Sequence, residues 1–225
     1  RLDRFHDRFE GALPRRYVES VRKAREEQRT NDPDLWKQLE ALGQVSKYPT
    51  QFYQESRPRT AVNCWHHNDH ESAAMWSQYV KSSDGVAVRS TYRRLVNAFD
   101  SGDDTVLILV GMVQYIDYET DMIDNFTNML LPVTHKRASF RHEQELRAVA
   151  LGSSRVEGSE RLQLDFREFP KSGIDVAVDL GGLLDSVYVA PAAPDWFRLA
   201  VESVIQRYGF AVPVVQSSLD DDPLW

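Results

Sequence analysis

The chain has 225 residues and a formal net charge of −7, and 42% of its residues are hydrophobic. This composition predicts a globular protein with a core of its own, built as one large domain or as one domain with a helical extension. The negative charge argues against non-specific binding to nucleic acids, and the apolar runs are too short to span a membrane. The single cysteine excludes an internal disulfide and fits a reducing compartment, so we expect a cytoplasmic protein.

The first sixty residues are predicted to form a helical part. A first helix covers residues 14–29, where Pro14 precedes apolar side chains at helical spacing, and a second covers residues 33–47, with Asp32 as its N-cap. Residues 48–60 contain two prolines and are predicted to form a loop. We expect the apolar side chains of the second helix to face the core, namely Leu35, Trp36, Leu39 and Leu42.

Beyond residue 60 the pattern changes to short runs of β-branched and aromatic residues between turn signals, which predicts a sheet. The predicted strands cover residues 61–65, 85–90, 106–118, 145–151, 161–169, 173–180, 183–190 and 212–217. The predicted helices between them cover residues 69–81, 91–99, 120–142 and 194–209. In the last helix, which Pro194 starts and Gly209 ends, one face is shared by Trp196, Leu199, Ala200, Ser203 and Val204.

The predicted fold class is therefore α+β. A helical N-terminal segment is followed by a mixed, mainly antiparallel sheet with interleaved helices. We divide this single domain into a helical part at residues 1–60 and an α+β core at residues 61–225.

Residues 61–80 bring three histidines and two carboxylates together within six positions, beside Cys64. The adjacent side chains of His66 and His67 point to opposite sides of an extended strand, which does not favour their convergence on one ion, and we expect no metal. Cys64 is predicted to be a small buried residue of the strand.

The same segment has the pattern of a helix start. Asn68 and Glu71 have the spacing of an N-cap and of the third helical residue, where the helix dipole favours negative charge. The free N–H groups of a helix N-terminus also bind anions, and His66 and His67 are candidate binding residues for such a ligand.

Two further groups of residues are candidates for contact with a nucleotide. Trp76 and Tyr79 can stack on a base, although packing in a core explains the same aromatic residues. At the exit of the GVAVRS strand, Arg89, Ser90 and Thr91 are typical of a phosphate site. Ser90 or Thr91 equally well caps the helix that follows.

The densest group of cations lies in residues 135–147, HKRASFRHEQELR. Glu143 and Glu145 stand two positions apart where a strand begins, so we expect both side chains on one side of the sheet as candidate catalytic carboxylates. In the alternative, the segment is the end of a helix followed by a strand, and its charges form salt bridges, with Arg141 paired to Glu145 four residues later. Three nearby cations are candidates for holding an anionic substrate, namely Lys136, Arg141 and Arg147.

Together, the segments CWHHNDHESAAMWSQY, DGVAVRST, VQYIDY, HKRASFRHEQELR and VYVAPAAPDWF resemble a bacterial family, the domain of unknown function numbered twenty-nine seventy-one. The resemblance spans essentially the whole chain. RFHDRFEG at residues 4–11 is similar to an element near the family's beginning, which implies a further strand upstream of Arg1. The matching elements are Met75-Trp76 with Tyr79, Gly85-Val86, Lys136, and Glu143-x-Glu145-x-Arg147.

This resemblance implies a bacterial, cytoplasmic α+β protein with a role in stress response, mobile elements or phage defence. A second resemblance concerns ADP-ribosyltransferases, in which a hydroxyl-bearing strand end precedes a Glu-x-Glu pair. It implies Ser90 as the hydroxyl of an NAD site, Glu145 as the carboxylate that orients the ribose hydroxyl, and Glu143 as the partner that activates the acceptor. The sequence departs from that layout, because it has no counterpart of the first strand, which carries an NAD-binding arginine or histidine in those enzymes.

The leading hypothesis is an enzyme that acts on a nucleotide or another phosphorylated, anionic small molecule. ADP-ribosyl transfer or NAD cleavage, with NAD as substrate, is its most concrete form. A first alternative is a non-catalytic module that senses a nucleotide or docks on a partner protein through residues 14–47. A second alternative is a metal-dependent nuclease or hydrolase, for which the candidate ligands are His66, His67, Asp69 and His70.

Overall fold

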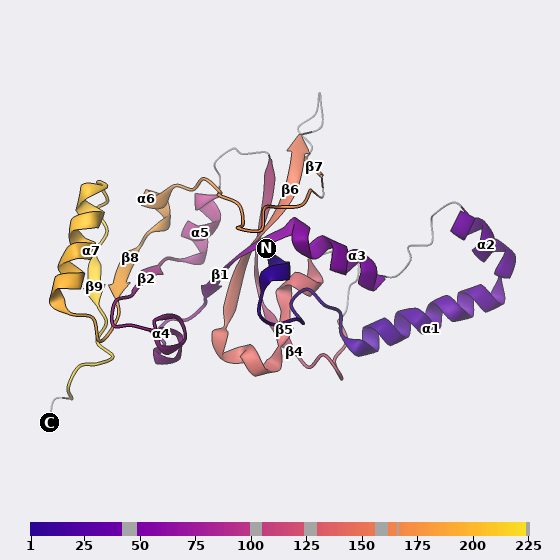
Figure 1. Cartoon of the computed structure of the whole chain (residues 1–225), viewed down its shortest axis with the longest axis horizontal. Coiled ribbons are helices and arrows are strands. Elements are labelled where there is room, and N and C mark those ends of the chain that lie inside the picture. Colours follow the sequence, from indigo (N-terminus) through magenta and orange to yellow (C-terminus); the bar gives the residue numbers. More distant parts are fainter. Residues whose placement is uncertain (42–48, 100–104, 124–129, 156–161, 166, 224–225) are drawn as a thin grey trace. The chain divides into compact units, whose positions relative to one another are not determined.

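The computed structural model describes residues 1–41, 49–99, 105–123, 130–155, 162–165 and 167–223. Its helices and strands confirm the α+β class, with helices at the N-terminus and between mainly antiparallel strands (Figure 1). The chain divides into two compact units. The first consists of Arg1–His67 and Asp104–Ile174, and the second of Asn68–Asp103 and Asp175–Trp225. The division of one domain at residues 60 and 61 stays a prediction.

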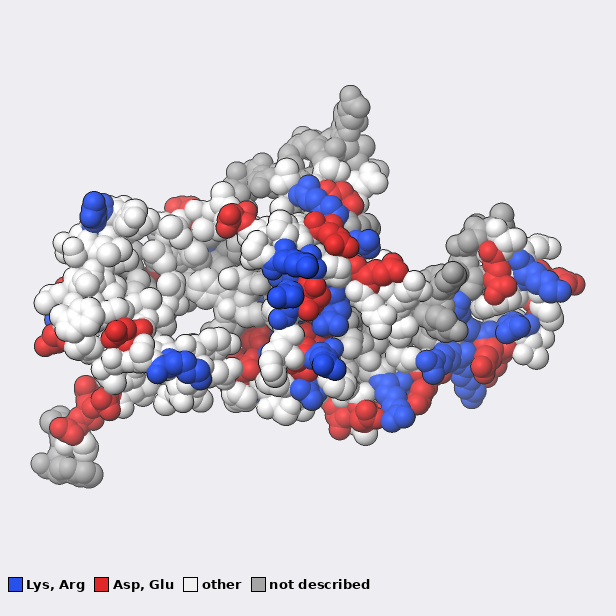
Figure 2. Space-filling model, in the orientation of Figure 1, with Lys and Arg blue, Asp and Glu red and all other residues white. Residues whose placement is uncertain are grey.

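Both predicted N-terminal helices are present in the first unit, after a short 3-10 turn at Leu2–Arg4. Helix α1 covers Arg15–Asn31, and Figure 2 shows positive and negative side chains alternating along it. Helix α2 covers Pro33–Ala41, and the predicted N-cap is confirmed, because the Asp32 carboxylate accepts a hydrogen bond from the backbone N–H of Leu35 at 2.9 Å. The expected core-facing side of α2 is half-buried at Trp36 and Leu39, whereas Leu35 is 43% exposed. Leu42 and the rest of the helix predicted to residue 47 lie outside the described residues.

The predicted loop at residues 48–60 is also wrong. Helix α3 covers Pro49–Ser56 and a 3-10 turn covers Arg57–Arg59. Proline is tolerated in the first turn of a helix, where its missing N–H has no helical partner to lose. The buried ring of Tyr53 gives α3 an anchor.

The main sheet of the first unit has the antiparallel order β1-β6-β3, with β7 paired to the far end of β6. These strands cover Thr60–His66 (β1), Val106–Met112 (β3), Glu145–Arg155 (β6) and Leu162–Leu164 (β7). The central strand β6 is buried throughout residues 145–153. Because side chains alternate along a strand, the side chains on the two faces of β6 pack into two separate cores.

Each face of β6 contributes to one of these cores. Val149 packs with Leu2 and Val133, so the N-terminal turn covers one face of the sheet. On the other face Ala150 packs with Ala61 and Phe169. Arg147 lies on the face of Val149, two residues away, and is therefore directed toward the N-terminal segment.

The segment before β6 differs most from its prediction. The long strand at 106–118 breaks after β3, and β4 (Gln114–Ile116) forms a parallel pair with β5 (His135–Arg137). The helix predicted at 120–142 is wrong for its described residues, which form two 3-10 segments at Leu131–Thr134 and Ala138–Glu143 around β5. Proline and β-branched residues at 132–134 disfavour an α-helix there, and pairing with β4 holds β5 extended. Residues 124–129 of the prediction lie outside the described residues.

The second unit contains the three-stranded sheet β2-β8-β9, in which β8 pairs antiparallel with β2 and parallel with β9. Its strands cover Val86–Arg89 (β2), Ser186–Val189 (β8) and Val214–Gln216 (β9). Its helices cover Ala73–Tyr79 (α4), Tyr92–Ala98 (α5), Leu180–Leu183 (α6) and Asp195–Arg207 (α7). None of the helices in the described part of the chain combines the length and the apolar character that a membrane span needs.

Two predicted strands are shorter than expected or missing. Among the described residues of the strand predicted at 161–169, those at 162–164 pair with a neighbouring strand. Residues 161 and 166 of this prediction lie outside the described residues. The strand predicted at 173–180 is wrong, since no ladder forms there and α6 begins at Leu180. Its alternating valines, Val176 and Val178, are half-buried on one side of an extended segment. In this segment the alternation of apolar and polar residues therefore reflects burial on one side, and it does not indicate pairing with another strand.

Candidate functional site

Five charged side chains meet on one face of the main sheet in the first unit, and we refer to them as the ionic cluster. Its members are Glu10, Lys136, Glu143, Glu145 and Arg147, none more than 7% exposed. The start of β6 provides Glu145 and Arg147, β5 provides Lys136, and Glu143 ends the 3-10 segment between them. Glu10 comes from the N-terminal segment that covers this face.

Lys136 joins the three carboxylates. Its ammonium donates hydrogen bonds to Oε2 of Glu143 and, at 2.5 Å, to Oε1 of Glu145. The same nitrogen lies 3.4 Å from Oε1 of Glu10. One cation therefore holds the two predicted catalytic carboxylates side by side.

Arg147 completes the network from the centre of the sheet. Its Nε donates to Oε2 of Glu145 at 2.6 Å, and its two terminal nitrogens donate to the two oxygens of Glu10 at 2.8 and 3.0 Å. A further hydrogen bond goes to the backbone carbonyl of Val133 at 2.6 Å. This two-pronged pairing uses the planar fork of the guanidinium and fixes Glu10 against β6.

Glu143 and Glu145 converge by a different route from the one predicted. Glu143 ends the 3-10 segment before β6 and lies outside the strand, yet its side chain meets that of Glu145 at Lys136, so the two side chains lie on one side of the sheet as expected. Between them Gln144 has φ 41°, the left-handed conformation, which is uncommon for a residue other than glycine. This turn brings the Glu143 side chain back to Lys136.

The network keeps Glu145 ionised. Burial alone would favour the neutral acid, but hydrogen bonding with Glu143, Arg147 and Lys136 and the charge of Arg147 lower the pKa of Glu145 to about 2. For Lys136, burial lowers the pKa, and hydrogen bonds to Glu143 and Glu145 outweigh that effect and raise it. At neutral pH Glu145 is therefore ionised and Lys136 is protonated.

Three residues of β1 and β4 surround the cluster. His66, opposite Glu145 in the sheet register, donates from Nδ1 to the backbone carbonyl of Glu143 at 2.7 Å. The Tyr115 hydroxyl accepts a hydrogen bond from the backbone N–H of Glu145 at 2.8 Å. Cys64 pairs with Arg147 in the register and is exposed, so its prediction as a buried residue is wrong.

The surroundings of the Cys64 thiol raise its pKa and so make it unreactive. Desolvation of the sulfur raises its pKa, Arg147 lowers it, and Glu145 raises it again, with a net rise to about 12. A thiol of this kind is protonated at neutral pH and is a poor nucleophile.

Arg141 and His67 are exposed beside the cluster and are not members of it. Arg141 reaches the backbone carbonyl of Tyr115 at 3.5 Å, and the backbone N–H of His67 donates to the carbonyl of Gln144 at 2.8 Å. The alternative pairing of Arg141 with Glu145 is wrong, because both Glu145 oxygens bind Lys136 and Arg147. Arg141 thus presents its guanidinium to solvent.

The remaining predicted residues belong to the second unit. Trp76 is half-buried and Tyr79 is 66% exposed, both on α4. The Ser90 hydroxyl donates to the backbone carbonyl of Leu183 at 2.6 Å. Thr91 is the N-cap of α5, which confirms the capping alternative for this pair of hydroxyl residues.

Helix α4 also begins later than predicted. Its N-cap is Ser72, whose hydroxyl accepts from the N–H of Met75 at 3.3 Å. Asn68 instead accepts from the N–H of His70 in a local turn, and Glu71 accepts from the Ser217 hydroxyl at 3.0 Å. The predicted start at residue 69 is wrong because both of its capping residues have other partners.

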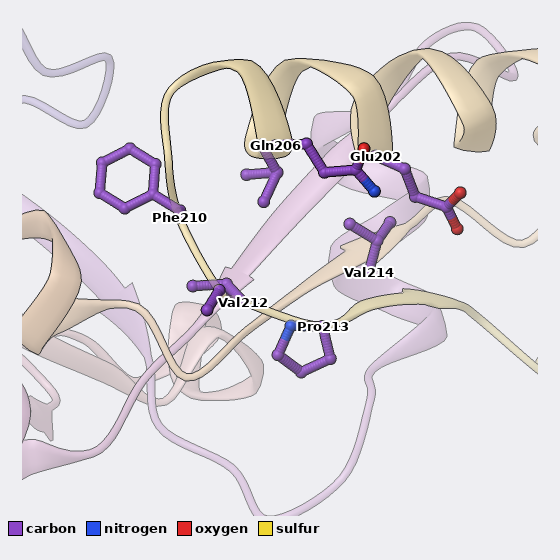
Figure 3. Close-up of a pocket in the computed structure, with 8 residues that line it drawn as sticks. Glu202, Gln206, Phe210, Val212, Pro213 and Val214 are labelled. Carbon is purple, nitrogen blue, oxygen red and sulfur yellow. The ribbon is translucent and has the colours of Figure 1, made fainter.

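A separate hollow of about 380 Å³ lies in the second unit, between the end of α7 and β9 (Figure 3). Its walls are mainly apolar, and its polar side chains are Glu202 and Gln206. None of the predicted site residues lines it. It is lined by Glu202, Ile205, Gln206, Phe210, Ala211, Val212, Pro213 and Val214.

Two members of the site are absent from the sequence-based prediction. Glu10 lies within the RFHDRFEG segment, more than 130 residues before Arg147 in the sequence, so no local pattern indicates their contact. Tyr115 lies in a run that reads as one long strand. The signal that the sequence offers is the Glu10-Gly11 pair, because glycine is favoured where a turn needs a positive φ; in the structure Gly11 has φ 77°.

In the described part of the chain, no group of three or more His, Cys, Asp or Glu side chains is arranged to hold a metal ion. Comparison with protein-family models, with curated proteins and with solved structures finds no match to this chain. The family resemblance seen in the sequence therefore stays a prediction, and the site has to be interpreted from its own geometry.

Proposed function

We propose that this protein is an enzyme that acts on a nucleotide or another phosphorylated substrate, with the ionic cluster as its catalytic centre. The observation that carries the proposal is the convergence of three carboxylates and two cations at a buried position. Removing five charged groups from water costs free energy that well-packed apolar residues would not cost. Strongly shifted pKa values are also concentrated at functional sites.

Glu145 is suited to stabilise positive charge. With a pKa of about 2 it is ionised at neutral pH and weakly basic, so it is a poor acceptor of a proton from substrate. Cleavage of a glycosidic bond passes through a transition state with positive charge at the anomeric carbon. A fixed carboxylate in a water-poor site stabilises such a charge without reorganisation.

NAD cleavage or ADP-ribosyl transfer is the most concrete version of this activity. The bond between the anomeric carbon and the nicotinamide nitrogen breaks, and nicotinamide leaves as a neutral molecule with the bonding electron pair. Water or an acceptor hydroxyl adds to the carbon and releases a proton. Glu145 would accept a hydrogen bond from the ribose hydroxyl, and the exposed Arg141 would hold a phosphate.

The test is NAD consumption by the purified chain, compared with Glu145→Gln. The amide keeps the shape and removes the charge, so we expect turnover to fall by about 100-fold or more. The melting temperature is measured with and without NAD, because the loss of charge beside Lys136 and Arg147 also lowers stability. We expect NAD to raise the melting temperature of both proteins.

An exposed pair of variants keeps the proposal testable if Glu145→Gln does not fold. Arg141→Ala removes the predicted phosphate contact from a solvent-exposed position, and we expect it to reduce the NAD-induced rise in melting temperature. Arg93→Ala removes an exposed arginine of α5 and serves as the matched control. A wild-type chain that neither consumes NAD nor is stabilised by NAD, ADP-ribose or ATP would contradict the proposal.

One observation favours a second candidate, a nucleotide-sensing module without catalysis. Both oxygens of Glu145 and the cations around it already have partners within the chain. A ligand that binds only at the exposed Arg141 and His67 needs no access to these carboxylates. This candidate predicts stabilisation by a nucleotide, no turnover, and the same stabilisation in Glu145→Gln.

A further inference from the structure

An arginine of the first unit packs against two phenylalanine rings beside the ionic cluster. The guanidinium carbon of Arg137 lies 4.9 Å from the centre of the Phe9 ring and 5.3 Å from the centre of the Phe140 ring. The Phe140 ring also contacts the ammonium of Lys136, which lies 4.8 Å from its centre. One aromatic ring therefore joins Arg137 to a member of the ionic cluster.

The chain fixes the guanidinium of Arg137 and leaves part of it open. The buried Asp7 accepts a hydrogen bond from Nε and pairs with Nη2, each at 3.0 Å. Nη1 has no hydrogen-bond or ion-pair partner among the residues that the structure describes. The Arg137 side chain is 41% exposed, so a ligand can reach it. A guanidinium that is already held in place loses little conformational freedom when it binds an oxygen atom of a ligand.

Phe9 provides an accessible aromatic ring next to this guanidinium. The residue is 38% exposed, and its ring lies edge-on to Tyr118, with ring centres 5.1 Å apart and an angle of 69° between the planes. Tyr118 is buried, and its hydroxyl donates to the backbone carbonyl of His135 at 3.2 Å. Because its neighbours are fixed, the Phe9 ring is a ready surface on which a flat ring of a ligand can stack.

The charges of the two segments that carry these residues are separated by burial. In residues 1–10 and 135–145, the exposed arginines are Arg4, Arg8 and Arg141. Asp3 is half-buried and pairs with Arg1, and all the other carboxylates of these segments are buried. The buried carboxylates are Asp7, Glu10, Glu143 and Glu145. The outer surface of the two segments therefore favours an anionic ligand.

We propose that Phe9 and Arg137 form a subsite for the nucleoside diphosphate part of the substrate, with the base on the Phe9 ring and a phosphate on Nη1 of Arg137. A nucleotide combines a flat ring with negative charge, and the subsite places an aromatic face beside a cation. The second phosphate of the ligand is then available to the exposed Arg141. The subsite rests on the proposed function, because its ligand is taken to be the substrate of the ionic cluster.

Isothermal titration calorimetry with ADP-ribose tests the subsite, because this molecule has the base and both phosphates but no bond to nicotinamide. Phe9→Leu keeps an apolar contact with Tyr118 and removes the aromatic face, and we expect it to weaken binding by about tenfold. Arg137→Lys keeps a cation for Asp7 and removes Nη1. We expect this variant to weaken binding by about tenfold or more, since lysine cannot offer the planar fork.

Each variant has a matched control in the same unit. Phe52→Leu changes a ring that is 42% exposed and lies edge-on to the neighbouring Tyr53, at 5.3 Å between ring centres. Arg15→Lys changes an arginine of α1 that also pairs with carboxylates. We expect both controls to bind ADP-ribose like the wild-type chain. The melting temperature of each variant confirms that it is folded, and Phe9→Leu decides alone if Arg137→Lys does not fold.

The outcomes separate the subsite from the proposed function. Wild-type binding of ADP-ribose that both variants weaken supports the subsite, even if the wild-type chain does not cleave NAD, a result that contradicts the catalytic proposal alone. Wild-type turnover of NAD with an unchanged KM in the folded variants would overturn the subsite and leave the proposed function standing. A folded variant of either residue that binds ADP-ribose as tightly as wild type, or a wild-type chain that does not bind it, would also overturn the subsite.

Discussion

Glu145 is the residue on which the electrostatics of the first unit converge. Its two oxygens bind different cations, Lys136 and Arg147, and its backbone N–H binds the Tyr115 hydroxyl. The two contacts of the carboxylate stabilise its ionised form, and together with the Glu143 side chain they outweigh the cost of burying a charge. The pKa of Glu145 is therefore a measurable consequence of the geometry.

The lowered pKa of Glu145 should make the free energy of unfolding depend on pH in acid. The pKa of Glu145 falls from an ordinary 4.5 to about 2 on folding, so its contribution is complete above about pH 4.5 and is lost as the pH falls toward 2. We expect the difference in free energy of unfolding between wild type and Glu145→Gln to be constant between about pH 5 and 7 and to shrink below about pH 4.5. Urea unfolding at a series of pH values measures it, and a difference that grows in acid would contradict the assignment.

Cys64 gives a second prediction at the scale of one residue. Its pKa of about 12 leaves about 1,000-fold less thiolate at pH 8 than an ordinary cysteine has. We therefore expect iodoacetamide to modify the native chain about 1,000-fold more slowly than the urea-unfolded chain, with a rate that still rises above pH 10. Fast alkylation at pH 7 would show that the thiol does not lie beside Glu145 as described.

At the scale of elements, the N-terminal segment and β6 are joined through charge as well as through apolar packing. Leu2 enters the core beside Val149, and Glu10 forms its two hydrogen bonds with Arg147. Asp7 adds an ion pair with Arg137 of β5 at 3.0 Å. The segment thus closes the face of the sheet on which the ionic cluster lies.

Removing Glu10 tests this connection. Glu10→Ala leaves the buried guanidinium of Arg147 with one carboxylate fewer, and we expect the free energy of unfolding to fall by about 3–5 kcal/mol. Urea unfolding followed by circular dichroism measures the change. The matched control is Glu19→Ala, which removes an exposed partner of Arg15 on α1 and should change stability little. Equal effects of the two substitutions would contradict a special role for Glu10.

The elements that could be predicted are those whose signals are local. Helix α1 after Pro14, the Asp32 cap and the strand at β1 follow from spacing and capping chemistry. The helix predicted at 120–142 fails because β5 is held extended by β4, a contact that leaves no periodic pattern.

The same distinction applies to the site. Lys136, Glu143, Glu145 and Arg147 are close in sequence, so their proximity was predictable from one segment. Their arrangement was not, since it depends on the left-handed Gln144 and on Glu10 from the other end of the unit.

At the scale of the whole molecule, the two units have different kinds of surface. The ionic cluster belongs to the first unit, with the exposed Arg141 beside it. The second unit carries exposed apolar side chains on α7, namely Trp196, Leu199 and Val204, and the hollow beside β9.

The catalytic role of the ionic cluster is tested by the release of nicotinamide from NAD, measured for the wild-type chain and for Glu145→Gln, with the folded state of each confirmed by its melting temperature. We expect turnover by the wild-type chain and a loss of about 100-fold or more in a folded Glu145→Gln variant. Equal turnover by the two folded proteins, or none by the wild type, would contradict the assignment of the ionic cluster as a catalytic centre.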